Sequence, residues 1–175
     1  MAQRPARSRS RRALVAWRRG AIERMRRSRA ATLSLLARLP EAAIRQPRTP
    51  RAWSIKDVLA HIAGWEEEGA RRLELIARGR GDRIRFFDTM PEVDAFNARV
   101  VGTARRTPLP RLVARLARAR VRLLRALQTL PSDALADPAH ELPVVVWLRE
   151  FAWTHERAHR GEIRAWWRMH RGARQ

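Results

Sequence analysis

The sequence predicts an all-α protein, a four-helix bundle with a short extra helix before the third long helix. Apolar residues recur with the helical period of 3.6 in four long segments, and prolines and glycines separate these segments. No segment alternates between apolar and polar residues with turn signals at both ends, as a half-buried strand would. With 175 residues and 45% hydrophobic residues, the chain is long enough for one buried core. We expect a basic, mobile tail over residues 1–9 and a single helical domain over residues 10–170.

The first long helix is predicted over residues 10–39, where seven apolar residues follow a helical period. Pro40 ends it, because proline cannot continue a helix. Pro47 and Pro50 favour an extended backbone before them, so the following dozen residues are expected to be extended.

The second long helix has the clearest start. Ser54 is a favourable N-cap residue, and Asp57 places a carboxylate in the first turn, near the positive end of the helix dipole. Apolar residues then continue to about Arg78, and Gly79 and Gly81 end the helix.

The remaining helices follow from the same pattern. The sequence predicts a short helix over residues 91–104, a third long helix over 110–130, a loop over 131–143 and a last helix over 144–169. Four long amphipathic helices joined by proline- and glycine-containing connections are typical of a helical bundle.

The last helix carries an unusual pair, His155 and His159. A continuous helical period places them on the predicted core face with these residues: Leu148, Phe151, Ala152, Ala158, Glu162, Ile163 and Trp166. Residues four apart lie one turn above each other, about 5–6 Å apart at Cβ. Buried imidazole nitrogens need hydrogen-bond partners, and a shared metal ion would satisfy both side chains.

His61, on the predicted second helix, is the third candidate ligand. Three imidazoles from two facing helices can bind a divalent metal ion and leave a coordination position open, as catalytic sites do. Imidazole ligands do not distinguish zinc from nickel. Four acidic residues near these histidines in sequence are candidates to orient an imidazole or act as a base: Glu66, Glu67, Glu156 and Glu162. The alternative interpretation is that the three histidines are simply packed in the core.

The chain is strongly basic, with 38 Lys and Arg against 17 Asp and Glu and a formal net charge of +21. Lys56 is the only lysine. Either the arginine-rich first 29 residues contact nucleic acid non-specifically, or the arginines reflect a compositional bias. Cysteine is absent, so any thiol chemistry needs a thiol from a second substrate. No apolar run approaches the ~20 residues of a membrane span, and we expect a cytoplasmic protein.

Two motifs resemble the DinB-like four-helix bundles. One is the segment WSIKDVLAHIAGWE at residues 53–66, and the other is HERAHRGEIRAW at residues 155–166. The opening WSIKD and the segment VDAFN at residues 93–97 are similar to the ClbS/DfsB-type branch. The resemblance covers about residues 10–169.

This resemblance implies a three-histidine metal site, here His61, His155 and His159. Members with this triad include thiol S-transferases and isomerases that use the bacterial thiols bacillithiol and mycothiol. The ClbS-like branch is associated instead with hydrolysis of a cyclopropane in a genotoxin, without a required metal ion.

Three hypotheses follow. The first is a metal-dependent thiol S-transferase or hydrolase that acts on a small electrophile in detoxification or stress resistance, with a pocket lined by Trp65, Trp147 and Phe151. The second is a metal-free protein that hydrolyses or sequesters a genotoxin, and the third is a basic DNA-binding bundle. The expected partners are a small-molecule substrate, nucleic acid at the basic N-terminus and a second copy of the chain in a homodimer.

Overall fold

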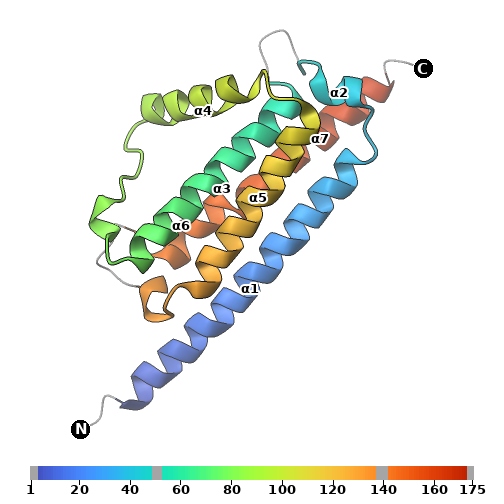
Figure 1. The fold of residues 1–175 in the computed structure, drawn as a ribbon. Coiled ribbons are helices and arrows are strands. Elements are labelled where there is room, and N and C mark those ends of the chain that lie inside the picture. The colour runs from blue at the N-terminus through green and yellow to red at the C-terminus, as the bar shows by residue number, and fades with distance from the viewer. Residues whose placement is uncertain (1–3, 49–52, 137–141, 173–175) are drawn as a thin grey trace.

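The computed structural model describes residues 4–48, 53–136 and 142–172. Four long helices form the bundle: α1 (Arg4–Leu36), α3 (Ile55–Ala77), α5 (Leu109–Thr129) and α7 (Trp153–Gly172). Three shorter helices join them: α2 (Glu41–Arg45), α4 (Met90–Ala104) and α6 (Val144–Phe151). Figure 1 shows α4 outside α3, and the N-terminal end of α1 projecting beyond its neighbours. The described residues contain no strand, so the all-α prediction is confirmed.

The segment after α1 differs from the prediction. Residues 41–45 were expected to be extended, but they form α2, in which Ala43 and Ile44 are buried. Pro40 precedes this helix, where proline is tolerated because the first helical N–H groups have no intrahelical partner. A proline restricts only its immediate neighbours, so Pro47 does not prevent the short helix before it.

The start of α3 is as predicted. The Asp57 backbone N–H donates to Ser54 Oγ (3.0 Å), and the Ser54 backbone N–H donates to Asp57 Oδ2 (3.0 Å). This reciprocal capping box defines where the helix begins. At the other end, Gly79 has φ +67°, a left-handed conformation that glycine adopts without steric strain.

The predicted last helix is interrupted at Ala152, which has φ −123° and ψ −97°. This break shifts the buried face of α7 by about one residue relative to a continuous helix. Glu156, which was not predicted to face the core, is therefore buried, whereas Ala158 and Glu162, which were predicted to face it, are exposed; Ile163 is buried as predicted. That part of the prediction was wrong because it assumed one unbroken helical phase.

The core contains two apolar clusters. One gathers around Leu73, Leu127 and Leu148, and the other around Leu59 and Leu112. Between the two clusters, at mid-length of the bundle, all four long helices place charged residues in the interior: Arg29, Glu66, Arg120 and Glu156.

Candidate metal centre

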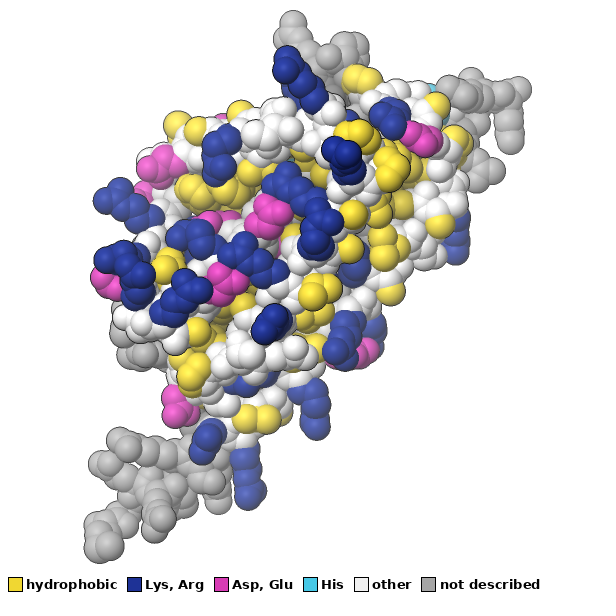
Figure 2. Space-filling view, viewed as in Figure 1, with side chains coloured by type: hydrophobic (Ala, Val, Ile, Leu, Met, Phe, Trp, Pro, Cys, Tyr) yellow, Lys and Arg dark blue, Asp and Glu magenta, His cyan; other side chains and the backbone are white. Residues whose placement is uncertain are grey.

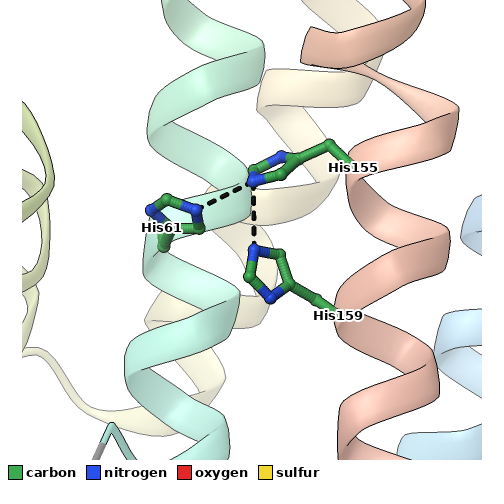
Figure 3. Close-up of side chains that lie close together, drawn as sticks. All are labelled: His61, His155 and His159. Atoms are coloured by element: carbon green, nitrogen blue, oxygen red, sulfur yellow. Dashed lines mark hydrogen bonds between the residues drawn. The ribbon is translucent and has the colours of Figure 1, made fainter. Parts of the chain in front are cut away.

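The structure brings the three predicted histidines together. His61 projects from α3, and His155 and His159 project from α7 towards it (Figure 3). The Nε2 atom of His155 lies 2.8 Å from Nε2 of His61 and 3.0 Å from Nε2 of His159. Ring nitrogens of all three residues lie within 4.8 Å of one another. We call these three residues the histidine cluster.

Hydrogen bonds among the three rings cannot fully satisfy this arrangement. A neutral imidazole has one N–H group and one nitrogen with a lone pair. The Nε2 atom of His155 therefore cannot form good hydrogen bonds with both neighbours, since its lone pair accepts one proton well. A tetrahedral metal ion with Zn–N bonds of 2.0–2.1 Å would separate its ligand nitrogens by about 3.3 Å. Small rotations of the side chains would convert the observed geometry into that arrangement, so the three residues fit a metal ion.

The electrostatic environment keeps two of these histidines neutral. Burial, together with the nearby His159, lowers the pKa of His61 to about 4. Burial, followed by the neighbouring His159 and His61, lowers the pKa of His155 to about 3. Both side chains therefore present unprotonated nitrogens at neutral pH, as metal ligation requires.

Of the four acidic residues suggested by the sequence, Glu162 contacts the histidine cluster. Its Oε2 atom lies 3.1 Å from Nδ1 of His159 and 3.4 Å from Nη1 of Arg48. A carboxylate at this position favours the tautomer with a proton on Nδ1, which leaves Nε2 of His159 free for a metal ion. The Nδ1 atoms of His61 and His155 are buried without a hydrogen-bond partner among the described residues.

Glu66 and Glu156 have a different role, which the sequence did not predict. Together with Arg29 and Arg120 they form what we call the charge network. Arg29 donates to Glu156 Oε1 (2.7 Å) and to Glu66 Oε1 (2.7 Å). Arg120 donates to Glu156 Oε2 (2.8 Å) and also to Glu66.

The two positive and two negative charges of this network balance. Burial raises the pKa of Glu66, and Arg120 and Arg29 oppose this shift. For Glu156 the two arginines prevail over burial and lower the pKa. We expect both carboxylates to be ionised at pH 7, because protonation of either would leave an unbalanced buried guanidinium. Glu67, the remaining candidate, pairs with Arg115 instead (2.7 Å).

Aromatic side chains border the histidine cluster on the α3 side. The ring of Trp53 lies 4.9 Å from that of His61, and the ring of Trp65 lies 6.2 Å from those of His61 and His155. Trp65 also contacts Phe151, at 5.0 Å between ring centroids.

Further aromatic residues pack around Trp65. Trp65 contacts Phe87 and Phe96 and donates from Nε1 to Oδ1 of Asn97 (3.0 Å). Trp147 contacts Phe151 but none of the three histidines. Of the three residues predicted to line a pocket, Trp65 is thus the one with ring contacts to the histidine cluster among the described residues. The sequence alone did not reveal Trp53, because this residue precedes α3 and its contact with His61 does not follow from the helical period.

Comparison with known proteins adds one finding. A family model described as the DinB superfamily matches residues 24–163, which include all three histidines. No curated protein and no solved structure is significantly similar to the chain. None of the described helices combines the length and apolar character required to cross a membrane.

Proposed function

Because this chain belongs to the DinB superfamily, we propose that its histidine cluster holds a divalent metal ion and that the protein is a metal-dependent enzyme. The observation that carries this proposal is the convergence of three Nε2 atoms, two of them 2.8 Å apart, from two facing helices. In contrast to the charge network, no arginine or lysine among the described residues donates to these nitrogens.

The proposed ligands are His61, His155 and His159, with zinc or nickel as the metal ion. Three protein ligands leave a coordination position open, at which a bound metal ion would lower the pKa of water or of a thiol. Glu162 orients His159, and the low pKa values of His61 and His155 keep their nitrogens available.

The substrates follow from the residues around the cluster. The chain contains no cysteine, so a thiol nucleophile has to be a second, low-molecular-weight substrate. Trp53 and Trp65 offer apolar ring surface beside the histidines, which suits a small apolar electrophile. In the proposed transfer the thiol releases its proton to solvent, its sulfur bonds to the electrophilic carbon, and the leaving group departs with the electrons of the broken bond. Hydrolysis, with water as the nucleophile, is the alternative reaction at the same site.

The first test is the metal content of the purified protein, measured by mass spectrometry before and after incubation with zinc or nickel. We expect about one equivalent in the wild type and a large loss in His61→Ala and His155→Ala. His170→Ala is the matched control, because His170 also lies on α7 but stacks on Trp166. Failure of the wild type to bind either metal would overturn the proposal.

Activity is the second readout. Wild type and His155→Ala, each loaded with metal, are assayed with a panel of bacterial thiols and an activated aryl halide, and with the same halide in the absence of thiol. Thiol-dependent turnover that requires His155 supports transfer, and thiol-independent turnover supports hydrolysis. A protein that binds metal but shows neither reaction with a broad panel of electrophiles would contradict the enzymatic part of the proposal.

A further inference from the structure

Two rows of arginines lie on the outer surface of the bundle, away from the histidine cluster. On α1 the row consists of Arg12, Arg19 and Arg26, and on α5 it consists of Arg111, Arg118 and Arg125. All six residues are exposed. Residues seven apart lie almost two turns apart on one face of a helix, about 10.5 Å along its axis. Each row therefore runs along its helix for about 21 Å.

The helices that carry these rows are antiparallel neighbours. Arg18 Nη1 donates to the carbonyl of Gln128 (3.2 Å), and Arg29 Nη1 donates to the carbonyl of Leu116 (2.7 Å). Moving from Arg18 to Arg29 along α1, the contacted residue of α5 moves back from Gln128 to Leu116. The two helices therefore run antiparallel. Both rows lie on the solvent-exposed side of these two helices, and we call the surface that carries them the α1–α5 face.

The positive charge of this face is not neutralised within the chain. Among the described residues, no acidic side chain pairs with any of the six arginines. α5 contains no acidic residue, and the only one on α1, Glu23, pairs with Arg27 (2.9 Å).

The same helix provides an internal contrast. Arg115 and Arg122, also seven residues apart on α5, both pair with glutamates of α3, Glu67 and Glu74 (2.7 Å each). Arg115 and Arg122 are therefore paired within the bundle. Arg118 and Arg125 border a depression that also includes Glu74 of α3 and Arg78 at its end, but they form no ion pair among the described residues and are available to an external anion.

Apolar side chains lie near the arginines on both helices. Val15 is 50% exposed and Val121 is 65% exposed, while Ile22 and Leu124 are partly buried against the core. Figure 2 shows hydrophobic side chains in the region where α5 and α1 meet, with arginines on either side. A depression along α1, lined by Arg19, Ile22 and Arg26, extends to Gln128 of α5.

We propose that the α1–α5 face binds the sugar–phosphate backbone of double-stranded nucleic acid without reading its sequence. Guanidinium groups form paired hydrogen bonds with phosphate oxygens. The grooves of a B-DNA duplex are about 6 and 12 Å wide, so rows on adjacent helices can reach phosphates on both sides of one groove. The small apolar residues between the rows then lie over the groove, where there is no phosphate. The face has no exposed tryptophan or phenylalanine of the kind that anchors proteins at a membrane surface.

The test measures binding of a fluorescently labelled duplex of about 30 base pairs by anisotropy, as a function of salt concentration. The face variant combines Arg19→Gln, Arg26→Gln and Arg118→Gln. The control variant combines Arg83→Gln, Arg106→Gln and Arg164→Gln, three exposed arginines outside α1 and α5. Both variants lower the formal net charge of +21 by three, so they differ only in where the charge is removed. Circular dichroism confirms that each remains folded.

Each phosphate contact contributes about 0.9 to the slope of log affinity against log salt. We expect the magnitude of this slope to be smaller by about 2.7 for the face variant than for the wild type, and to be unchanged for the control variant. An equal loss in both variants would show that net charge alone drives binding, and would overturn the proposal. Anionic vesicles and an acidic helical peptide serve as competitors. Binding to either of these in preference to the duplex would assign the face to a different partner and would equally overturn it. His155→Ala should bind the duplex like the wild type, since the proposed metal site is separate.

Discussion

The histidine cluster and the charge network are two polar groups that share helices α3 and α7, and they differ in how their hydrogen-bonding atoms are satisfied. In the charge network, two guanidinium groups and two carboxylates balance in charge and bond to one another. Arg29 and Arg120 also donate to backbone carbonyls of Leu116 and Met25. The network is nearly complete within the chain, with one carboxylate oxygen of Glu66 left without a partner.

The histidine cluster is not complete in this way. Its nitrogens converge on one point, and hydrogen bonds among the rings cannot satisfy all of them. The comparison shows how adjacent residues of one helix, His155 and Glu156, can serve different purposes. Glu156 joins the helices, whereas His155 faces a position suited to an external ligand.

The largest expected effect comes from breaking the charge network. Arg120→Met leaves two buried carboxylates with one arginine, so the free energy of unfolding should fall by about 3–5 kcal/mol. Urea denaturation monitored by tryptophan fluorescence measures it. The control is Arg122→Met, on the same helix but in a half-exposed pair with Glu74, which should lower stability by about 0–1 kcal/mol. Equal effects of the two substitutions would contradict a structural role for the network.

The histidine cluster should instead make the metal-free protein sensitive to pH. The pKa values of His61 and His155 are lowered from 6.5 to about 4 and about 3, so the unfolded chain binds more protons than the folded chain below pH 6.5. Stability should therefore decrease as the pH falls from 6.5 towards 4, by about 1.4 kcal/mol per pH unit for each histidine.

Urea denaturation at pH 7, 6 and 5 in the presence of a chelator measures this slope. His155→Gln removes one of the two histidines, and its slope between pH 6 and pH 5 should be shallower by about 1.4 kcal/mol per unit. Identical slopes in the wild type and the variant would show that His155 is not held neutral by the fold.

Metal binding should stabilise the fold through the histidine cluster. Zinc at 100 times its Kd should raise the free energy of unfolding of the wild type by about 2.7 kcal/mol. His155→Ala should show almost none of this increase, although its metal-free form remains folded. Thermal unfolding with and without zinc measures the difference. Equal stabilisation of the wild type and His155→Ala would show that zinc binds at a site other than the histidine cluster.

The smallest effect should come from the carboxylate that orients His159. Glu162→Gln should weaken zinc affinity about tenfold, because a residue that orients a metal ligand typically contributes 10–100-fold and Glu162 is half exposed. Competition with a chromophoric chelator measures the affinity. Glu150→Gln is the control, since Glu150 is a similarly exposed glutamate that pairs with Arg149. A change of the same size in the control would indicate a general charge effect.

Much of this protein follows from local sequence patterns. Ser54 and Asp57 predicted the start of α3, and apolar periodicity predicted the four long segments, because caps and helical periods involve residues only a few positions apart. His155 and His159 had to be neighbours in any helix that contains both. The match to the DinB superfamily agrees with the resemblance seen in the two histidine-containing motifs.

Tertiary structure decided which side chains meet across helices. The break at Ala152 set the rotation of α7, and this rotation buried Glu156 and exposed Glu162. Glu156 could therefore join Arg29, 127 positions away, and Glu162 could reach His159 from the surface. The pairing of Arg115 with Glu67 likewise depends on which face of α5 lies against α3. Such contacts arise from helix packing, for which a sequence carries no local signal.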